Sequence, residues 1–405
     1  MRSETAPVTG LIGTGVFFTG VGFASTLSYG AIVGIETLGI PNASYALLLM
    51  VASLLGAAAS VTLGYISDRV RDRRVLVFGC ALMGALGFGL IYVTRNQLAF
   101  VIAMAVIVPF GSITFSQSFS YARSFYNARR ADRAEFMMSM LRTLFSIAWA
   151  VVPPVAGWIA ATTTVFDVYG IGAAAYLIVA LVYGVMMLNP VAKIGVEAKT
   201  AESGESAPPS RPAIDRTIMV GALGVILILT ATQLTGVTSP LLIVTTLGGS
   251  LAELGIYAGL AAALEVPFMI MWGYALKRVG KHTIIVIAAV LYAIYLVLLS
   301  RAGSVSDVLW LQLINGPAMA ALMSIPLSYM QDAIRGRVGL STSLLDIVYL
   351  VASLASAALF GAMTAATKDY PLVFVVAACL ALIGAAVLFA SHRLLGAKPL
   401  PIKEN

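Results

Sequence analysis

Charged side chains are scarce in this chain. They make up 11% of its 405 residues, and 60% of the residues are hydrophobic, whereas a soluble domain carries about a quarter charged residues. A soluble fold could not bury so much apolar surface. Apolar runs of about 20 residues, the length that a helix needs to cross roughly 30 Å of hydrocarbon, recur along nearly the whole sequence. We therefore expect an all-α membrane protein.

The residues that build catalytic or metal centres are few as well. The chain has two cysteines and two histidines. Cys80 and Cys379 fall in predicted spans of different halves, so we expect neither a disulfide nor a metal cluster. The sequence also has no phosphate-binding glycine-rich loop and no soluble domain large enough to hydrolyse ATP. We expect no enzymatic activity, no cofactor and no primary pumping.

Twelve apolar segments predict twelve transmembrane helices. They lie at 10–35, 43–66, 74–94, 98–121, 137–160 and 166–189, and then at 217–243, 252–276, 283–301, 307–330, 340–366 and 371–392. The polar, proline-rich segment between the two sets predicts a linker. We thus divide the chain into an N-terminal six-helix half (1–189), a cytoplasmic linker (190–214) and a C-terminal six-helix half (215–405). The first apolar segment is too long for a signal-peptide core and is expected to remain as span one.

Lysine and arginine distribute unevenly over the predicted loops. Of the 25 basic residues, 21 lie in the even-numbered loops and the two tails, and only Arg95, Arg301 and Lys368 lie in the odd-numbered loops. Cytoplasmic loops retain positive charge during insertion. The pattern therefore predicts a multi-pass protein of the bacterial inner (plasma) membrane with both termini in the cytoplasm. The net charge of +7 needs no nucleic-acid partner to explain it.

The two predicted halves echo one another. Gly64-Tyr65 lies at the end of span two and is continued by Asp68-Arg69-Val70. Gly273-Tyr274 lies at the end of span eight and is continued by Lys277-Arg278-Val279. The interval is 209 residues. Related six-span halves around a cytosolic linker are typical of transporters that rock their halves about a central site.

The loop after span two carries a recognisable pattern. It reads Gly64-x-x-x-Asp68-Arg69-x-x-x-Arg73-Arg74, and it resembles the signature loop of the major facilitator superfamily. The resemblance implies a conformational latch, in which the aspartate pairs across the seam between the halves. The alternative is an ordinary basic cytoplasmic loop, although such a loop requires no glycine or aspartate at fixed spacing.

Further motifs are similar to those of the bacterial sugar efflux transporters. They are Leu141-Arg142, Ala148-Trp149 and Pro153-Pro154 around span five, Gly259-x-x-x-x-Leu264-Glu265-x-Pro267 in span eight, and Gln312, Asn315 and Tyr329-Met330-Gln331-Asp332 in and after span ten. The resemblance implies the major facilitator fold, with two pseudo-symmetric six-helix halves in a monomer.

Three charged residues fall inside predicted spans: Arg142, Glu265 and Asp346. A charge at the bilayer centre costs at least roughly 2.5–3.5 kcal/mol, so each requires a partner or a function. Burial favours the protonated form of a carboxyl group, which suits Glu265 as a proton carrier, but a protonated glutamate could equally bond a neighbouring helix. Arg142 and Asp346 occupy similar depths and could pair as a proton-coupling site, unless Arg142 snorkels to the interface.

Polar and aromatic side chains inside the spans could bind a sugar. Amides and hydroxyls match sugar hydroxyls, and aromatic faces cover their C–H surfaces. The candidates are Tyr29, Gln117, Trp149, Gln233, Gln312 and Asn315. Amides within membranes also serve simply to join helices, and the sequence leaves both uses open.

The sequence thus favours secondary active export of a sugar or small glycoside, driven by proton antiport and alternating access. The expected partners are the solute, protons and the lipid bilayer. A multidrug/proton antiporter of the same fold is the main alternative, and its pocket should be aromatic with few amides. A non-transporting membrane receptor is a further alternative, which the short tails and linker disfavour.

Overall fold

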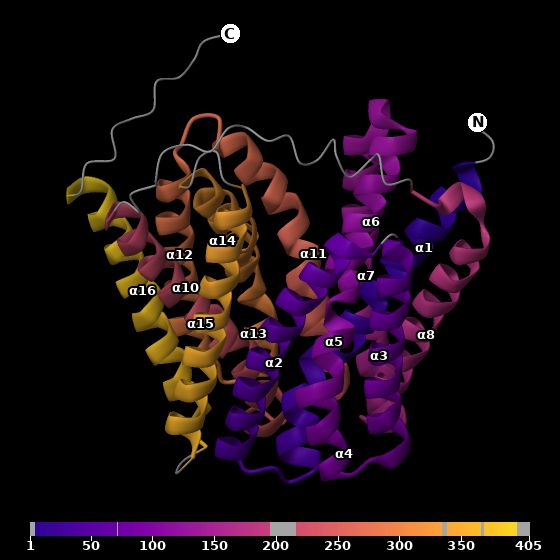
Figure 1. Ribbon diagram of the computed structural model, residues 1–405. Coiled ribbons are helices and arrows are strands. Elements are labelled where there is room, and N and C mark those ends of the chain that lie inside the picture. Colours follow the sequence, from indigo (N-terminus) through magenta and orange to yellow (C-terminus); the bar gives the residue numbers. More distant parts are fainter. Residues whose placement is uncertain (1–4, 71, 195–215, 334–337, 366–367, 395–405) are drawn as a thin grey trace. The chain divides into compact units, whose positions relative to one another are not determined.

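The computed structural model describes residues 5–70, 72–194, 216–333, 338–365 and 368–394, and their regular structure is entirely helical (Figure 1). The first α-helices are α1 (Thr5–Thr26), α2 (Asn42–Arg69), α3 (Arg73–Thr94), α4 (Gln97–Ile102), α5 (Val108–Ser112), α6 (Thr114–Arg129), α7 (Ala134–Thr162) and α8 (Asp167–Leu188). The later ones are α10 (Arg216–Leu241), α11 (Leu251–Ala275), α12 (Lys281–Leu299), α13 (Val305–Trp310), α14 (Gln312–Ala333), α15 (Val338–Thr364) and α16 (Tyr370–Leu394).

Each predicted span coincides with helix. Eleven helical segments of the described residues are long and apolar enough to cross a membrane, and the remaining predicted span, 307–330, is divided between α13 and α14. The fourth span is interrupted too, because a π-helical turn (Ala103–Ile107) separates α4 from α5. Side-chain caps start both broken spans: Asn96 accepts from the amide of Ala99, and Ser304 from that of Asp307.

A backbone feature repeats at the interval seen in the sequence. Spans one and seven both end in a π-helical turn, Ile32–Thr37 and Leu242–Thr246. A glycine with positive φ follows each turn, Gly39 at 69° and Gly248 at 67°. Because glycine has no Cβ, it adopts this conformation at little cost. Gly248 lies 209 residues after Gly39, so the interval of the sequence echo also relates the backbone of the two segments.

The chain forms two compact units. Unit 1 comprises residues 1–205, 237–263 and 360–367, and unit 2 comprises 206–236, 264–359 and 368–405. Helices α10, α11 and α15 contribute one end to each unit. Unit 1 is built around α1, α3, α7 and α8, and unit 2 around α12, α14 and α16.

Glycines allow the helices of each unit to approach closely, as small residues do in membrane bundles. A Cβ on Gly111 of α5 would lie 2.6 Å from the Cα of Gly84 on α3, and one on Gly84 would lie 2.5 Å from the ring of Tyr176 on α8. In unit 2, a Cβ on Gly224 of α10 would lie 2.8 Å from the carbonyl oxygen of Gly384 on α16. These backbone contacts set the positions of the side chains described next.

Candidate functional site

The three intramembrane charges lie on α7, α11 and α15. Arg142 and Asp346 are exposed and Glu265 is half-buried. Within the described part of the chain, none of the three side chains forms a hydrogen bond or an ion pair. Arg142 belongs to unit 1 and Asp346 to unit 2, so their pairing stays a prediction. Unpaired charges in apolar helices are expected where a protein offers a water-filled path or a coupling site.

Glu265 is held next to a close helix crossing. Its neighbour Leu264 packs against Gly316 of α14, where an added Cβ would lie 2.8 Å from the Leu264 Cβ. Farther along α11, the indole of Trp272 donates a hydrogen bond to the carbonyl of Pro317 (2.8 Å). These two contacts fix the segment of α11 that carries Glu265 against α14.

Gln312 and Asn315 form a buried amide pair on α14. The Gln312 Nε2 donates to the backbone carbonyl of Val308 (3.0 Å), and the Asn315 Nδ2 donates to the Gln312 Oε1 (2.8 Å). Because a carbonyl can only accept, Val308 fixes the orientation of both amides. The Gln312 Nε2 also approaches the hydroxyl of Tyr295 on α12 (3.5 Å). The bond to Val308 and the bond between the two amides are local in the sequence, and the approach to Tyr295 reaches a neighbouring helix. A solute-binding role for the pair stays a prediction.

The other candidate binding residues occupy different environments. In unit 1, the Gln117 Oε1 on α6 and the Trp149 Nε1 on α7 are enclosed without a hydrogen-bond partner among the described residues. The Tyr29 hydroxyl donates to the carbonyl of Pro153 (3.1 Å) and lies beside Gly157. Gln233, on α10, is exposed. The structure therefore brings Gln312 and Asn315 into one network and leaves the other four residues outside it.

The signature loop begins at the end of α2. Gly64 has open space where a side chain would stand, and the guanidinium of Arg69 lies 3.9 Å from the centre of the Tyr65 ring. The side chain of Asp68 lies outside the described residues, so its role in the latch stays a prediction. The Arg73 Nη1 donates to the hydroxyls of Ser120 (2.9 Å) and Ser124 (3.0 Å) on α6.

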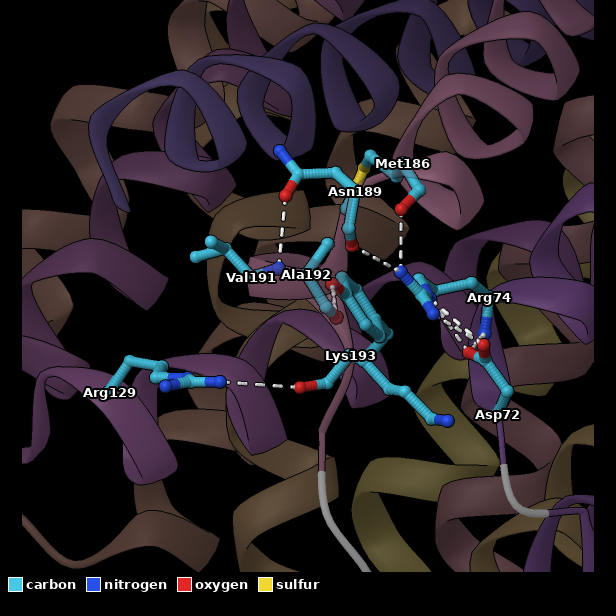
Figure 2. Close-up of polar contacts among 9 residues, drawn as sticks. Asp72, Arg74, Arg129, Met186, Asn189, Val191, Ala192 and Lys193 are labelled. Carbon is cyan, nitrogen blue, oxygen red and sulfur yellow. Dashed lines mark hydrogen bonds and ion pairs between the residues drawn. The ribbon is translucent and has the colours of Figure 1, made fainter. Parts of the chain in front are cut away.

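Arg74 makes the densest set of polar contacts in the loop (Figure 2). Its Nη2 lies 2.6 Å from the Asp72 Oδ2, and its Nη1 donates to the carbonyls of Met186 (2.5 Å) and Asn189 (3.2 Å) at the end of α8. A cation is favourable at a helix C-terminus. The hydrogen bonds from Arg74 hold the pKa of the Asp72 carboxyl below its usual range.

Further hydrogen bonds hold the segment that follows α8 in place. Residues Pro190–Ala192 form a 3₁₀ turn, and the Tyr121 hydroxyl donates to the Ala192 carbonyl (2.7 Å). Arg129 reaches the Lys193 carbonyl (3.5 Å; Figure 2). The first residues of the predicted linker are therefore bonded to α6, and its residues 195–214 lie outside the described part.

Two features of the structure were not anticipated. Asp72 was not singled out, although an aspartate shortly before an apolar run, here two residues upstream of the predicted span 74–94, is a signal for a helix N-cap. Its carboxylate does accept from the Arg74 amide (3.1 Å). The two histidines, His282 and His392, stack with ring centres 3.8 Å apart. No sequence pattern relates residues so distant in the chain.

Comparisons with known proteins agree with this architecture. The family model described as Major Facilitator Superfamily matches residues 11–221 and 221–404. The sugar efflux transporter A of Dickeya chrysanthemi is 29% identical over 83% of this chain and 83% of its own length. The sugar efflux transporter B of Salmonella typhimurium is 30% identical over 72% of each chain.

Solved structures share the fold at low sequence identity. The nucleoside transporter NupG superposes with a TM-score of 0.77 at 14% identity, covering 95% of this chain and 99% of its own. The peptide transporter POT superposes with a TM-score of 0.78 at 13% identity, covering 96% and 94%. These likenesses concern the arrangement of the helices.

Proposed function

Since the chain belongs to the major facilitator superfamily, we propose that it is a secondary active transporter that exports a sugar or small glycoside by proton antiport and alternating access. Relatives at 28–30% identity, which cover 72–83% of this chain, are named sugar efflux transporters. A multi-pass bacterial inner-membrane location with cytoplasmic termini is part of the proposal.

The observation that carries proton coupling is the placement of the intramembrane charges. Glu265 and Asp346 are carboxyl groups within apolar helices, and neither is neutralised by a described partner. The charge state of a carboxyl group in an apolar helix depends strongly on its hydration and on nearby charges, so it can change when the conformation of the protein changes. We assign proton binding and release to Glu265 or Asp346. Arg142 is the cation whose interactions change when that carboxyl group gains or loses its proton.

One feature favours the multidrug alternative. A cavity of about 390 Å³ opens between α1, α6 and α7 in unit 1. Its wall is predominantly apolar and includes Phe17, Phe18, Met137 and Met140. Such a wall suits a lipophilic solute, because methionine and aromatic side chains adapt to varied apolar shapes.

The decisive test uses the purified protein in proteoliposomes. Proton movement is recorded when a panel of sugars, glycosides and lipophilic cations is added, with protein-free liposomes as the control. We expect a signal from sugars or glycosides that disappears when an ionophore abolishes the proton gradient. A signal from the cations alone would replace the proposal by multidrug export, and silence from the whole panel would contradict transport of these solutes.

A further inference from the structure

Two helix ends meet in unit 1 on the side away from the N-terminus of α1. The Asn42 side chain, at the start of α2, donates a hydrogen bond from Nδ2 to the backbone carbonyl of Thr364, the last residue of α15 (3.3 Å). Both residues are buried, with 6% and 3% of their surfaces exposed. The bond therefore joins the first turn of one span to the free carbonyls that end another.

The surrounding contacts make this crossing tight. The ring of Tyr45 packs edge-on against Phe360, with centres 6.5 Å apart. A Cβ added to Gly361 would lie 2.7 Å from the Cβ of Ala46. The approach of α2 and α15 thus depends on a glycine, and it encloses the Asn42–Thr364 bond away from water.

A second crossing occupies the equivalent place in the repeat. Residues 251–255 of α11 follow residues 42–46 of α2 by 209 positions, and they pack against the end of α7. A Cβ on Gly157 would lie 2.5 Å from the carbonyl oxygen of Leu251, and a Cβ on Gly255 would strike the carbonyl oxygen of Pro153. The counterpart of Asn42 is therefore Leu251, whose side chain has no donor. Of these two equivalent positions, only Asn42 can clasp the opposing helix through its side chain.

We propose that the Asn42–Thr364 hydrogen bond is a clasp that closes the transporter at the α2–α15 crossing and breaks each time these two helix ends part. The inference rests on the alternating access of the proposed function. Export requires the α2 and α15 ends to part, and parting them breaks a buried bond. The strength of the clasp therefore sets part of the balance between the closed and open states.

The test measures how often the crossing opens. A reporter cysteine replaces Thr364, because its side chain is buried while its backbone carbonyl, the acceptor of the clasp, is retained. Exposed Cys379 is changed to alanine, and buried Cys80 is kept as an internal reporter of folding. The rate of labelling by a hydrophilic maleimide is measured at neutral pH, and the labelled peptide is identified by mass.

Two substitutions break the clasp in different ways. Asn42→Asp keeps the shape of the side chain and places a favourable negative charge at a helix N-terminus, but it has no N–H to donate at neutral pH. Asn42→Ala removes the polar group altogether. Ser44→Ala, on the exposed surface of the same turn, is the matched control.

We expect both Asn42 variants to label the reporter about five to ten times faster than the parent, the effect of losing one buried neutral hydrogen bond, and Ser44→Ala to leave the rate unchanged. Unchanged labelling in Asn42→Asp would overturn the proposal, and so would a rise accompanied by labelling of Cys80, because that reports unfolding. The readout needs no solute. Faster labelling with no sugar export by the parent would therefore count against the proposed function and leave the clasp standing.

Discussion

Arg74 shows how this protein places a charge among buried groups. Its side chain is 3% exposed, and a buried guanidinium is tolerated only when its donors are satisfied. Asp72 supplies the opposite charge and accepts from Nε and Nη2, and the carbonyls of Met186 and Asn189 accept from Nη1. One arginine thus ties the start of α3 to the end of α8, so its removal would leave two helix ends unsatisfied.

The Asp72–Arg74 pair makes stability depend on pH. Because Arg74 holds the pKa of Asp72 below its usual range, the carboxylate stabilises the fold above about pH 4, the ordinary range of an aspartate, and this contribution is lost as the pH falls through the lower pKa of the folded state. We predict that Asp72→Asn lowers stability by about 2 kcal/mol near pH 7, and that its difference from the parent shrinks on acidification below about pH 4.

Thermal unfolding in detergent at a series of pH values measures this difference. The matched control is Asp132→Asn, because Asp132 is exposed and lies 3.8 Å from Arg133 in a surface pair, which is worth little. A difference between Asp72→Asn and the parent that persists undiminished in acid would show that the carboxylate charge is not what stabilises the loop.

At the scale of helices, close crossings depend on particular glycines. Gly111 and Gly84 bring α5 and α3 into backbone contact. We predict that Gly111→Ala destabilises the protein by roughly 1–3 kcal/mol, because neither backbone can yield to the added methyl group. Gly79→Ala on α3 is the control: nothing lies within 4 Å of its added Cβ, so the helix propensity of alanine should make it neutral or stabilising.

Comparing the thermal midpoints of these two variants separates the effect of helix packing from the effect of the helix propensity of alanine. Equal effects of Gly111→Ala and Gly79→Ala would contradict the crossing as described. The same logic explains the glycine content of the chain, 37 residues in all, because helices in lipid gain little from burying apolar surface and must gain from close packing instead.

At the scale of the whole molecule, the proposed proton coupling depends on a complete transport cycle. We predict that Glu265→Gln preserves exchange of solute down its gradient but abolishes uphill transport, because a glutamine cannot carry a proton. The control is Glu253→Gln on the same helix: Glu253 accepts bonds from the backbone and hydroxyl of Ser250, and it has a capping role. Counterflow and gradient-driven uptake in proteoliposomes measure the two activities.

Normal uphill transport by Glu265→Gln would shift proton carriage to Asp346. Loss of both activities would mean that the side chain supports the fold or the binding of solute, and a thermal midpoint equal to that of the parent would assign it to binding. Glu253 lies on the same helix as Glu265. Uptake and counterflow by Glu253→Gln therefore show whether replacing any acidic residue of α11 has the effect seen for Glu265→Gln.

The sequence by itself determined the class of protein and the location of its helices. Apolar runs of fixed length can only be spans in lipid, so the predicted segments coincide with helices, including the interrupted span at 307–330. The interval of 209 residues, read from Gly64 and Gly273, recurs in the backbone at Gly39 and Gly248. The family motifs could also be recognised from the sequence, because each consists of residues that are close together in the chain.

Only the tertiary structure decided which polar side chains meet. The bonds of Arg74 to the end of α8, of Asn42 to Thr364 and of Tyr29 to Pro153 depend on helix rotation and depth. A span of uniformly apolar residues fixes neither, because hydropathy is almost the same on every face. Those two variables are set instead by glycine crossings such as that of Gly84 with Gly111, where contact between distant backbones determines the packing.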